Sequence, residues 1–270
     1  MTLYDALHID LNVSELLSLV GAGGKTSIMF QLAQELKASG KRVLVTTTTN
    51  LACSEALWAD NLIIDSSRDL CLLSKVEPGT IVCLGSGMVN DKGKFKGVDR
   101  EFISEIYQKH LFDYIVVEAD GSKRKPIKAP AHYEPLIPSE TTRTIGVIGL
   151  DALDKAITGE HVHRPEIFCS VTGKNMGDLI DRQCLINLIL SEDGLFKDVP
   201  HGCRRHVVFN KADHTDRREE AEITVHELTG MLTPIDGFII AAIGKGCIYT
   251  AGGAVRRSKL KQALSKNLRG

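Results

Sequence analysis

Eight short apolar runs constrain the fold of this chain more than any other feature of its sequence. They fall at residues 16–20, 42–48, 62–64, 80–84, 114–117, 144–148, 206–209 and 238–243. Most are apolar throughout instead of alternating with polar residues, which is typical of strands that helices cover on both faces. Apolar residues at helical spacing follow the first run. The pattern predicts an α/β fold with a mostly parallel, doubly wound sheet flanked by helices.

The length of the chain suits one large domain. No internal repeat or low-complexity linker divides the 270 residues, so we expect a single domain over 1–270. Residues 123–138 hold four of the eight prolines and are expected to form a long surface excursion, and residues 149–200 are a candidate helical insert. We therefore expect an inserted surface or helical region at about 123–200, and a short basic helix at 258–268.

A glycine-rich loop after the first run carries the strongest functional signal. Its backbone N–H groups would wrap around phosphate oxygens, and the following helix N-terminus adds positive partial charge. Lys25 would reach the β- and γ-phosphates, and the Thr26 hydroxyl would bind Mg²⁺. The full pattern G-x-x-x-x-G-K-[ST] is shortened, because Leu19 stands at its first glycine. The sequence predicts a P-loop NTPase-like site with nucleotide contacts from Gly21, Ala22, Gly23, Gly24, Lys25, Thr26 and Ser27.

Acidic side chains follow the apolar run at 114–117. Phosphoryl chemistry on a phosphate loop needs a further Mg²⁺ anchor, which usually comes from the end of a neighbouring buried strand. Glu118 ends this run and Asp120 lies two residues on, so both could share one side of the strand. Thr47 and Thr48 are further candidates, with an ordinary β-branched strand as the alternative. We predict catalytic roles for Lys25, Glu118 and Asp120, and metal contacts from Thr26, Glu118, Asp120 and Thr47.

A second nucleotide motif, N-K-x-D, follows the run at 206–209. A carboxylate such as Asp213 accepts hydrogen bonds from the two N–H groups on the guanine edge, which adenine does not offer in that arrangement. The aliphatic part of the lysine side chain can cover the base. The motif predicts base contacts from Asn210, Lys211 and Asp213, and favours GTP over ATP. A polar strand end is the alternative.

Basic residues and a histidine lie near these motifs. Lys123, Arg124 and Lys128 follow the two acidic residues closely, and His163 and Arg164 precede a proline. We predict that these five side chains contact an anionic substrate or a partner protein beside the Mg²⁺ site. A solvated basic loop and a structural turn are the competing interpretations.

Composition excludes several classes of protein. Lys+Arg number 33 and Asp+Glu 34, so the net charge of −1 argues against a nucleic-acid coat. The longest apolar runs fall far short of the roughly 20 residues that a membrane span needs. Seven scattered cysteines without a C-x-x-C motif indicate reduced thiols, and no signal peptide is visible, so we expect a cytoplasmic protein.

Taken in order, the motifs resemble those of metallochaperone-type GTPases, in which an apolar strand is followed by E-x-x-G, matched here by Glu118 to Gly121. A closer resemblance is to the YqeC family, proposed accessory proteins of selenium-dependent molybdenum hydroxylases. The matching stretches are 20–26, 45–49, 117–122, 128–130, 162–165 and 210–213, which run through nearly the whole chain. The resemblance implies a role in making or inserting a selenium-containing cofactor, with a molybdenum hydroxylase or its cofactor-assembly proteins as partners.

Three functions are compatible with these motifs. The first is a Mg²⁺-dependent GTP or ATP hydrolase that acts as a maturation factor and switches loops on hydrolysis. The second is a small-molecule kinase or ligase, in which the basic loop binds the acceptor. The third is a nucleotide-binding scaffold without turnover. The fate of the γ-phosphate separates the first two, and the absence of turnover identifies the third.

Overall fold

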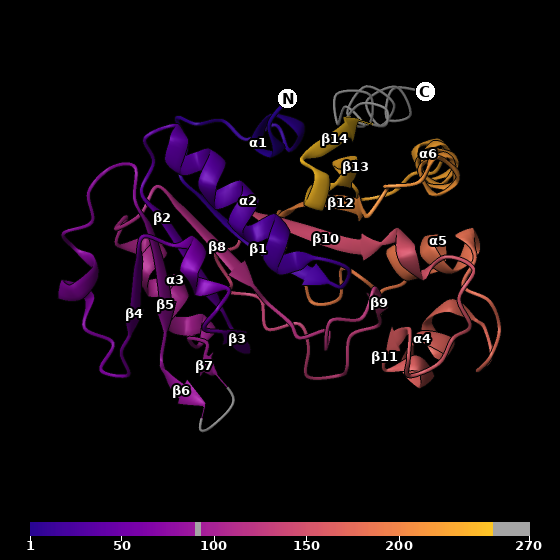
Figure 1. Ribbon diagram of the computed structural model, residues 1–270, viewed down its shortest axis with the longest axis horizontal. Coiled ribbons are helices and arrows are strands. Elements are labelled where there is room, and N and C mark those ends of the chain that lie inside the picture. Colours follow the sequence, from indigo (N-terminus) through magenta and orange to yellow (C-terminus); the bar gives the residue numbers. More distant parts are fainter. Residues whose placement is uncertain (90–92, 251–270) are drawn as a thin grey trace, which may run out of the picture.

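The computed structural model describes residues 1–89 and 93–250, and within them nine strands form one sheet (Figure 1). The spatial order is β14-β13-β12-β10-β1-β8-β2-β5-β4, and every neighbouring pair is parallel except β13 and β14. All eight predicted strands form, which confirms the expectation of an α/β fold with a mostly parallel sheet. The strands are β1 (Glu15–Gly21), β2 (Val43–Thr47), β4 (Asn61–Ile64), β5 (Ile81–Gly85), β8 (Tyr114–Glu118), β10 (Arg143–Gly149), β12 (Arg204–Asn210), β13 (Gly237–Ala242) and β14 (Cys247–Thr250).

Helices cover both faces of this sheet. Leu17 and Leu19 of β1 pack with α1 (Leu3–Ala6) and α2 (Lys25–Ala38), which lie on one face. Leu16 and Val20 point to the other face, because side chains alternate along a strand. That face is covered by α3 (Arg100–Gln108), α5 (Arg182–Leu190) and α6 (Thr215–Gly230). Burial on both faces explains why the strand sequences are apolar throughout.

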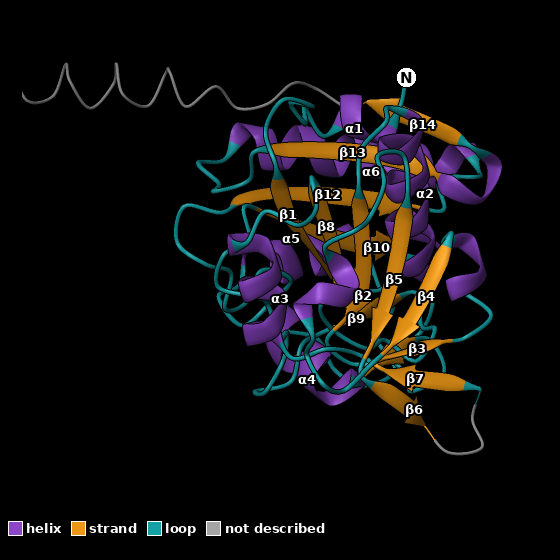
Figure 2. Ribbon diagram, turned by 90° about the vertical axis from the view of Figure 1, so that its left-hand side faces the viewer, coloured by secondary structure: helices purple, strands orange, loops and turns teal. Residues whose placement is uncertain are grey.

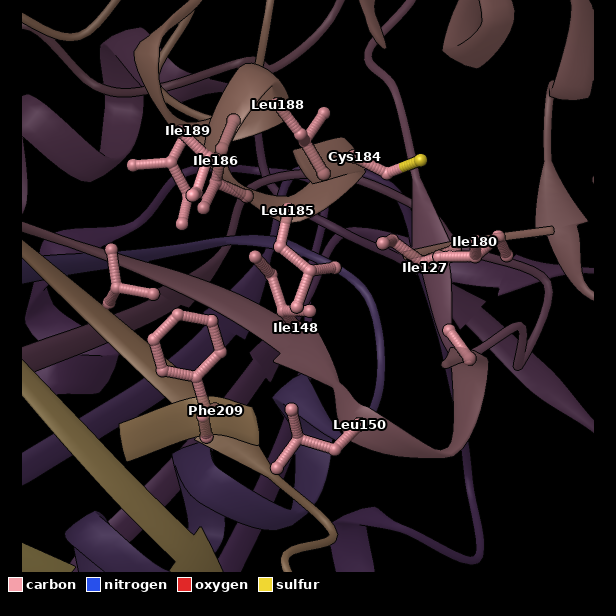
Figure 3. Packing of buried hydrophobic residues seen from close by; sticks show 14 of the residues in the cluster. Ile127, Ile148, Leu150, Ile180, Cys184, Leu185, Ile186, Leu188, Ile189 and Phe209 are labelled. Atoms are coloured by element: carbon pink, nitrogen blue, oxygen red, sulfur yellow. The ribbon is translucent and has the colours of Figure 1, made fainter. Parts of the chain in front are cut away.

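The stretch from residue 123 to residue 200 contributes to the main core. It contains β10, a central strand, and α5, whose Leu185 points toward Ile148 of β10 near Phe209 of β12 (Figure 3). The same stretch forms a two-stranded sheet and a further helix beside α5. These elements are β9 (Ile127–Lys128), β11 (Val162–His163) and α4 (Pro165–Thr172).

A small antiparallel sheet extends beyond the carboxyl ends of β2 and β5 (Figure 2). Its strands are β3 (Asn50–Ala52), β7 (Lys94–Lys96) and β6 (Gly87–Val89). Short 3₁₀ helices complete the chain at η1 (Ala56–Trp58), η2 (Leu70–Leu73), η3 (Leu150–Ala152) and η4 (Ile243–Lys245). The helix expected at 258–268 lies outside the described residues. Within the described part, no helix has the length and apolar character to cross a membrane, and all seven cysteines are unpaired.

The strand order changes direction at β1 and β10. From β1 the chain passes to β2 on one side, and from β10 it passes to β12 on the other, although β1 and β10 are neighbours. Open α/β sheets place their ligands at such a switch point, outside the carboxyl ends of the strands. The predicted phosphate loop follows β1 directly at this position.

Candidate functional site

Backbone geometry forces glycine into the loop between β1 and α2. Gly21, Gly23 and Gly24 have φ angles of 89°, 93° and 122°, a region that side chains rarely allow. A Cβ atom on Gly23 would lie 2.2 Å from the backbone nitrogen of Gly149, and one on Gly24 would lie 2.4 Å from the amide nitrogen of Asn210. The loop is therefore closely packed against the ends of β10 and β12.

Lys25, the first residue of α2, lies buried behind this loop with 2% of its surface exposed. Its ammonium donates a hydrogen bond to the Gly21 carbonyl at 2.7 Å. It also lies 3.0 Å from Oδ1 of Asp120 and 3.7 Å from Oε1 of Glu118. Burial by itself would lower the pKa of Lys25, but the two carboxylates outweigh it and the pKa is raised. The lysine is therefore a charged cation held at the base of the loop.

Thr26 and Glu118 form a cluster of oxygen ligands beside the lysine. The Thr26 hydroxyl donates to Oε2 of Glu118 at 2.7 Å, and burial raises the pKa of Glu118. Hard oxygen donors of this kind suit Mg²⁺, which takes one or two protein ligands and completes its shell with water and phosphate. No group of three or more His, Cys, Asp and Glu side chains suited to a metal occurs in the described residues.

Two threonines at the end of β2 donate hydrogen bonds to the backbone carbonyl of Glu118. Thr47 is fully buried and its hydroxyl donates to the Glu118 carbonyl at 2.8 Å. The hydroxyl of Thr48 is buried without a hydrogen-bond partner in the described structure. Thr47 thus fixes the end of β8, and its predicted metal contact stays a prediction.

Asp120 lies deeper than Glu118, with 1% of its surface exposed. Its Oδ2 accepts a hydrogen bond from the Gly21 N–H at 3.1 Å and lies 2.9 Å from the ammonium of Lys128. Its Oδ1 faces Lys25. Asp120 therefore joins the phosphate loop to the segment after β8, and Glu118 is better placed than Asp120 to meet a metal ion.

Of the three N-K-x-D residues, Asn210 holds neighbouring loops together, whereas Lys211 and Asp213 form ion pairs. Asn210 is buried, donates to the Gly23 carbonyl at 2.9 Å and accepts from the Ile243 N–H at 3.1 Å, so it ties together the loops after β1, β12 and β13. The Lys211 ammonium lies 2.7 Å from a carboxylate oxygen of Asp151. Asp213 faces Lys245 at 3.4 Å near the protein surface. The base contacts predicted for Lys211 and Asp213 remain predictions.

A cavity of about 440 Å³ opens over the phosphate loop. Its walls join the loop and α2 to Glu118, the basic segment after β8 and Lys211. Thr49 and Lys125 also line this cavity, as do Glu55 and Lys94, which the sequence did not identify as site residues. Both residues lie outside the recognised motifs, and nothing in their local sequence marks them. The cavity brings together all predicted phosphate-loop residues from Gly23 to Ser27.

A second cavity of about 570 Å³ adjoins the first. The two share Thr49, Gly121, Lys123 and Lys125 as wall residues. His163 and Arg164 line the second cavity, and Arg124 lines the first, so the structure gathers four of the five predicted substrate residues around the two cavities. Lys128 differs, because it is 1% exposed and its ammonium is enclosed by Asp120, Glu134 and the Gly121 carbonyl.

Comparisons with known proteins agree on one family. A sequence model of the YqeC family, described as YqeC protein, matches residues 17–166. The uncharacterized protein YqeC of Escherichia coli strain K12 is 35% identical over 257 residues, which cover 93% of this chain and 96% of that protein. The family match includes the phosphate loop, Glu118, Asp120 and the wall residues of the second cavity. The chain therefore belongs to the YqeC family.

Proposed function

We propose that this protein binds a nucleoside triphosphate with Mg²⁺ in the cavity over the phosphate loop and hydrolyses it. The observation that carries the proposal is the position of Lys25, a buried cation behind a glycine loop, faced by Glu118 and Asp120. Three left-handed glycines and the start of α2 supply backbone N–H groups for phosphate oxygens. The loop lies at the switch point of the sheet, where such ligands bind.

Lys25 and Thr26 would change partners when a triphosphate enters. Lys25 would turn from its two carboxylates to the β- and γ-phosphates, and Thr26 with Glu118 would hold Mg²⁺. The metal, when bound, neutralises charge on the phosphate oxygens. Asp120 would keep its hydrogen bond to Gly21 and its pair with Lys128, and so hold the loop in shape. Slow turnover is expected without a partner, because loop positioning dominates this chemistry.

GTP is the favoured nucleotide, with ATP as the alternative. Asn210 fixes the loops around the proposed base site by bridging Gly23 and Ile243. Asp213 lies at the end of the same segment, and a carboxylate there would accept from the guanine N–H groups. Its present partner, Lys245, is exposed, so exchanging that ion pair for guanine would cost little.

The cellular role that we propose is that of an accessory factor for selenium-dependent molybdenum hydroxylases. The resemblance of the motifs to those of the YqeC family implies this role, and a switch driven by hydrolysis suits a protein that hands over a labile cofactor. Deletion of the gene should abolish selenium-dependent hydroxylase activity and leave other molybdenum enzymes active. A general loss of molybdenum enzymes would point instead to pterin synthesis.

The direct test of the nucleotide site compares thermal stabilisation by GTP, ATP and CTP, each with and without Mg²⁺. A ligand at one hundred times its Kd adds about 2.7 kcal/mol of stability, which a melting curve resolves. We expect GTP with Mg²⁺ to stabilise most, and Lys25→Ala to remove the effect. Because Lys25→Ala leaves two buried carboxylates without their cation, Thr26→Val provides a second variant that keeps the ion pairs.

Lys37→Ala is the matched control, because Lys37 is a half-exposed lysine on the same helix whose ammonium pairs with Asp60. It should retain the nucleotide response. Equal stabilisation of the parent protein, Lys25→Ala and Thr26→Val would rule out the phosphate loop as the nucleotide site.

The second cavity favours one alternative function, transfer of a phosphoryl or nucleotidyl group to a small molecule. An acceptor there would share a wall with the nucleotide phosphates. Release of free phosphate by the protein alone supports hydrolysis, whereas a phosphorylated or ligated small molecule supports transfer.

A further inference from the structure

The second cavity is connected to the phosphate loop by an unbroken series of buried ion pairs. Lys25 lies 3.0 Å from Asp120, Asp120 lies 2.9 Å from Lys128, and Lys128 lies 2.6 Å from Glu134. Glu134 then accepts two hydrogen bonds from Arg164, at 2.6 and 2.9 Å. Lys25 lines the first cavity, whereas Glu134 and Arg164 line the second. We call this series the charge relay.

The charge relay is electrically balanced once the neighbouring Glu118 is included, which lies 3.7 Å from Lys25. Lys25, Lys128 and Arg164 carry three positive charges, and Glu118, Asp120 and Glu134 carry three negative charges when all are ionised. Burial would raise the pKa of Glu134, but hydrogen bonds from Arg164 and Lys128 lower it to about 2, so Glu134 is ionised at neutral pH. These six side chains therefore carry almost no net charge that could attract a ligand.

Spare positive charge comes instead from the segment that separates the two cavities. Lys123 and Arg124 have no carboxylate partner among the described residues, and the Lys125 ammonium donates to the Glu160 carbonyl. Lys123 lines both cavities. Unpaired cations on the wall of a cavity attract anions, because low-dielectric walls concentrate their field.

The backbone around these cations is held in an uncommon conformation. Lys123, Arg124 and Arg164 have φ angles of 47°, 60° and 64°, which non-glycine residues rarely adopt. Such conformations cost of order 1–3 kcal/mol each and gather at ligand-binding sites. The fold thus holds these three basic residues in place around the cavities despite the local cost.

Neutral hydrogen-bonding groups complete the second cavity. Burial lowers the pKa of His163 to about 4, with Arg164 and Lys128 adding to the effect, so its imidazole is neutral at neutral pH. The Tyr133 hydroxyl accepts from Arg164 at 3.2 Å. The cavity is thus lined by cations and neutral polar groups, together with Glu134, whose charge Lys128 and Arg164 compensate. Such a lining suits a small organic molecule that bears an anionic group.

We propose that the second cavity binds a small anionic molecule, carrying a phosphate or carboxylate group, as the second ligand of the nucleotide site. The inference rests on the proposed nucleotide function, because the relay couples the two cavities through Lys25. A triphosphate that draws Lys25 toward itself leaves Asp120 to interact more strongly with Lys128, which loosens Lys128 from Glu134 and leaves Glu134 to hold Arg164 more tightly. Nucleotide and anion should therefore weaken each other's binding by the same factor.

The experiment measures the affinity of a non-hydrolysable GTP analogue with Mg²⁺, with and without a saturating small anion. Inorganic phosphate and malonate are the two probes, and they distinguish a phosphate ligand from a carboxylate ligand. Gly159→Trp fills the second cavity, since Gly159 lines it, has open space at its Cβ and has no left-handed backbone. Gly230→Trp is the matched control, because Gly230 has the same open space at the end of α6.

In the parent protein and in Gly230→Trp, one of the two anions should weaken nucleotide binding by about tenfold, a coupling of ordinary size. Gly159→Trp should keep its affinity for the nucleotide and lose the effect of the anion. An anion that tightens nucleotide binding, has no effect, or acts equally on Gly159→Trp would overturn the proposal. If the analogue does not bind at all, the nucleotide function fails, and direct anion titration of the parent protein and Gly159→Trp then decides the second cavity separately.

Discussion

Two buried ion clusters lie at opposite ends of the same strands. At the amino ends, Arg143 has 0% of its surface exposed and forms a bidentate pair with Glu15, at 2.8 and 2.9 Å. The same guanidinium donates to the Leu7 carbonyl at 2.8 Å and lies 3.1 Å from a ring nitrogen of His206. These contacts join α1 to β1, β10 and β12, and none of the four residues lines either cavity.

The cluster at the carboxyl ends uses the same chemistry with a different result. Lys25 faces two carboxylates, and Oδ1 of Asp120 lacks hydrogen-bond geometry although Lys25 lies 3.0 Å away. The cluster borders two cavities, and cations without partners lie next to it. Both the Arg143 cluster and the Lys25 cluster are therefore buried and ion-paired, although we propose that only the second binds a ligand. The difference lies in access from a cavity, incomplete hydrogen bonding and spare charge nearby.

The largest effect is expected from Arg143→Met. It leaves Glu15 buried without its cation, so the free energy of unfolding should fall by about 3–5 kcal/mol. Chemical denaturation measures this loss, and nucleotide affinity in the folded protein should not change. Arg42→Met is the control, because the Arg42–Asp113 pair is half-exposed and worth less than about 1 kcal/mol. A loss of nucleotide affinity in Arg143→Met would break the distinction between the two clusters.

The main sheet is predictable from sequence because its strands are covered on both faces and therefore read as continuous apolar runs. The small sheet is not, since its three-residue strands alternate exposed and buried positions. In β7, Lys94 and Lys96 are exposed on either side of the buried Phe95, so no apolar run marks this strand in the sequence.

The glycine loop between β1 and α2 is equally predictable, because its glycines, Lys25 and Thr26 are contiguous. Its binding of phosphate stays a prediction. The charge relay is not predictable from sequence, because ion pairs depend on long-range contacts. Glu134 was not identified as a site residue, although it joins Lys128 to Arg164, 30 residues further on. Arg143 and Glu15 are 128 residues apart. Only the folded sheet brings such charges together.

Acid pH should weaken the two clusters unequally. Burial lowers the pKa of His206 to about 3, below its ordinary value of 6.5, so the fold favours the neutral ring. The unfolded chain then takes up a proton first, and stability is lost as the pH falls from about 6.5 toward 3. Between about pH 7 and pH 5 the loss from His206 should reach about 2 kcal/mol, at about 1.4 kcal/mol per pH unit below 6.5.

His163 has the same sign but a smaller effect. Its pKa is lowered to about 4, yet the ring is only half-buried, so we expect about 1 kcal/mol over the same range. The comparison of His206→Gln, His163→Gln and the parent protein by denaturation at each pH isolates the two contributions. Saturating phosphate should reduce the His163 contribution and leave that of His206 unchanged. A larger pH effect from His163 than from His206 would contradict the assignment of a closed cluster at the amino ends.

The smallest effect on stability is expected from Asp213→Ala, which tests the exposed end of the proposed nucleotide site. The Asp213–Lys245 pair is 3.4 Å long and solvent-accessible, so its loss should change the free energy of unfolding by less than about 1 kcal/mol. Affinity for GTP should fall about tenfold, or about 1.4 kcal/mol, because the guanine N–H groups lose their acceptor. Affinity for ATP should change less than about twofold, since adenine does not present these two N–H groups to Asp213.

Asp216→Ala, at the start of α6, is the matched control and should alter neither the affinity for GTP nor the affinity for ATP. Equal losses for GTP and ATP would place Asp213 among residues that shape the loop, as Asn210 does, and would remove the preference for guanine.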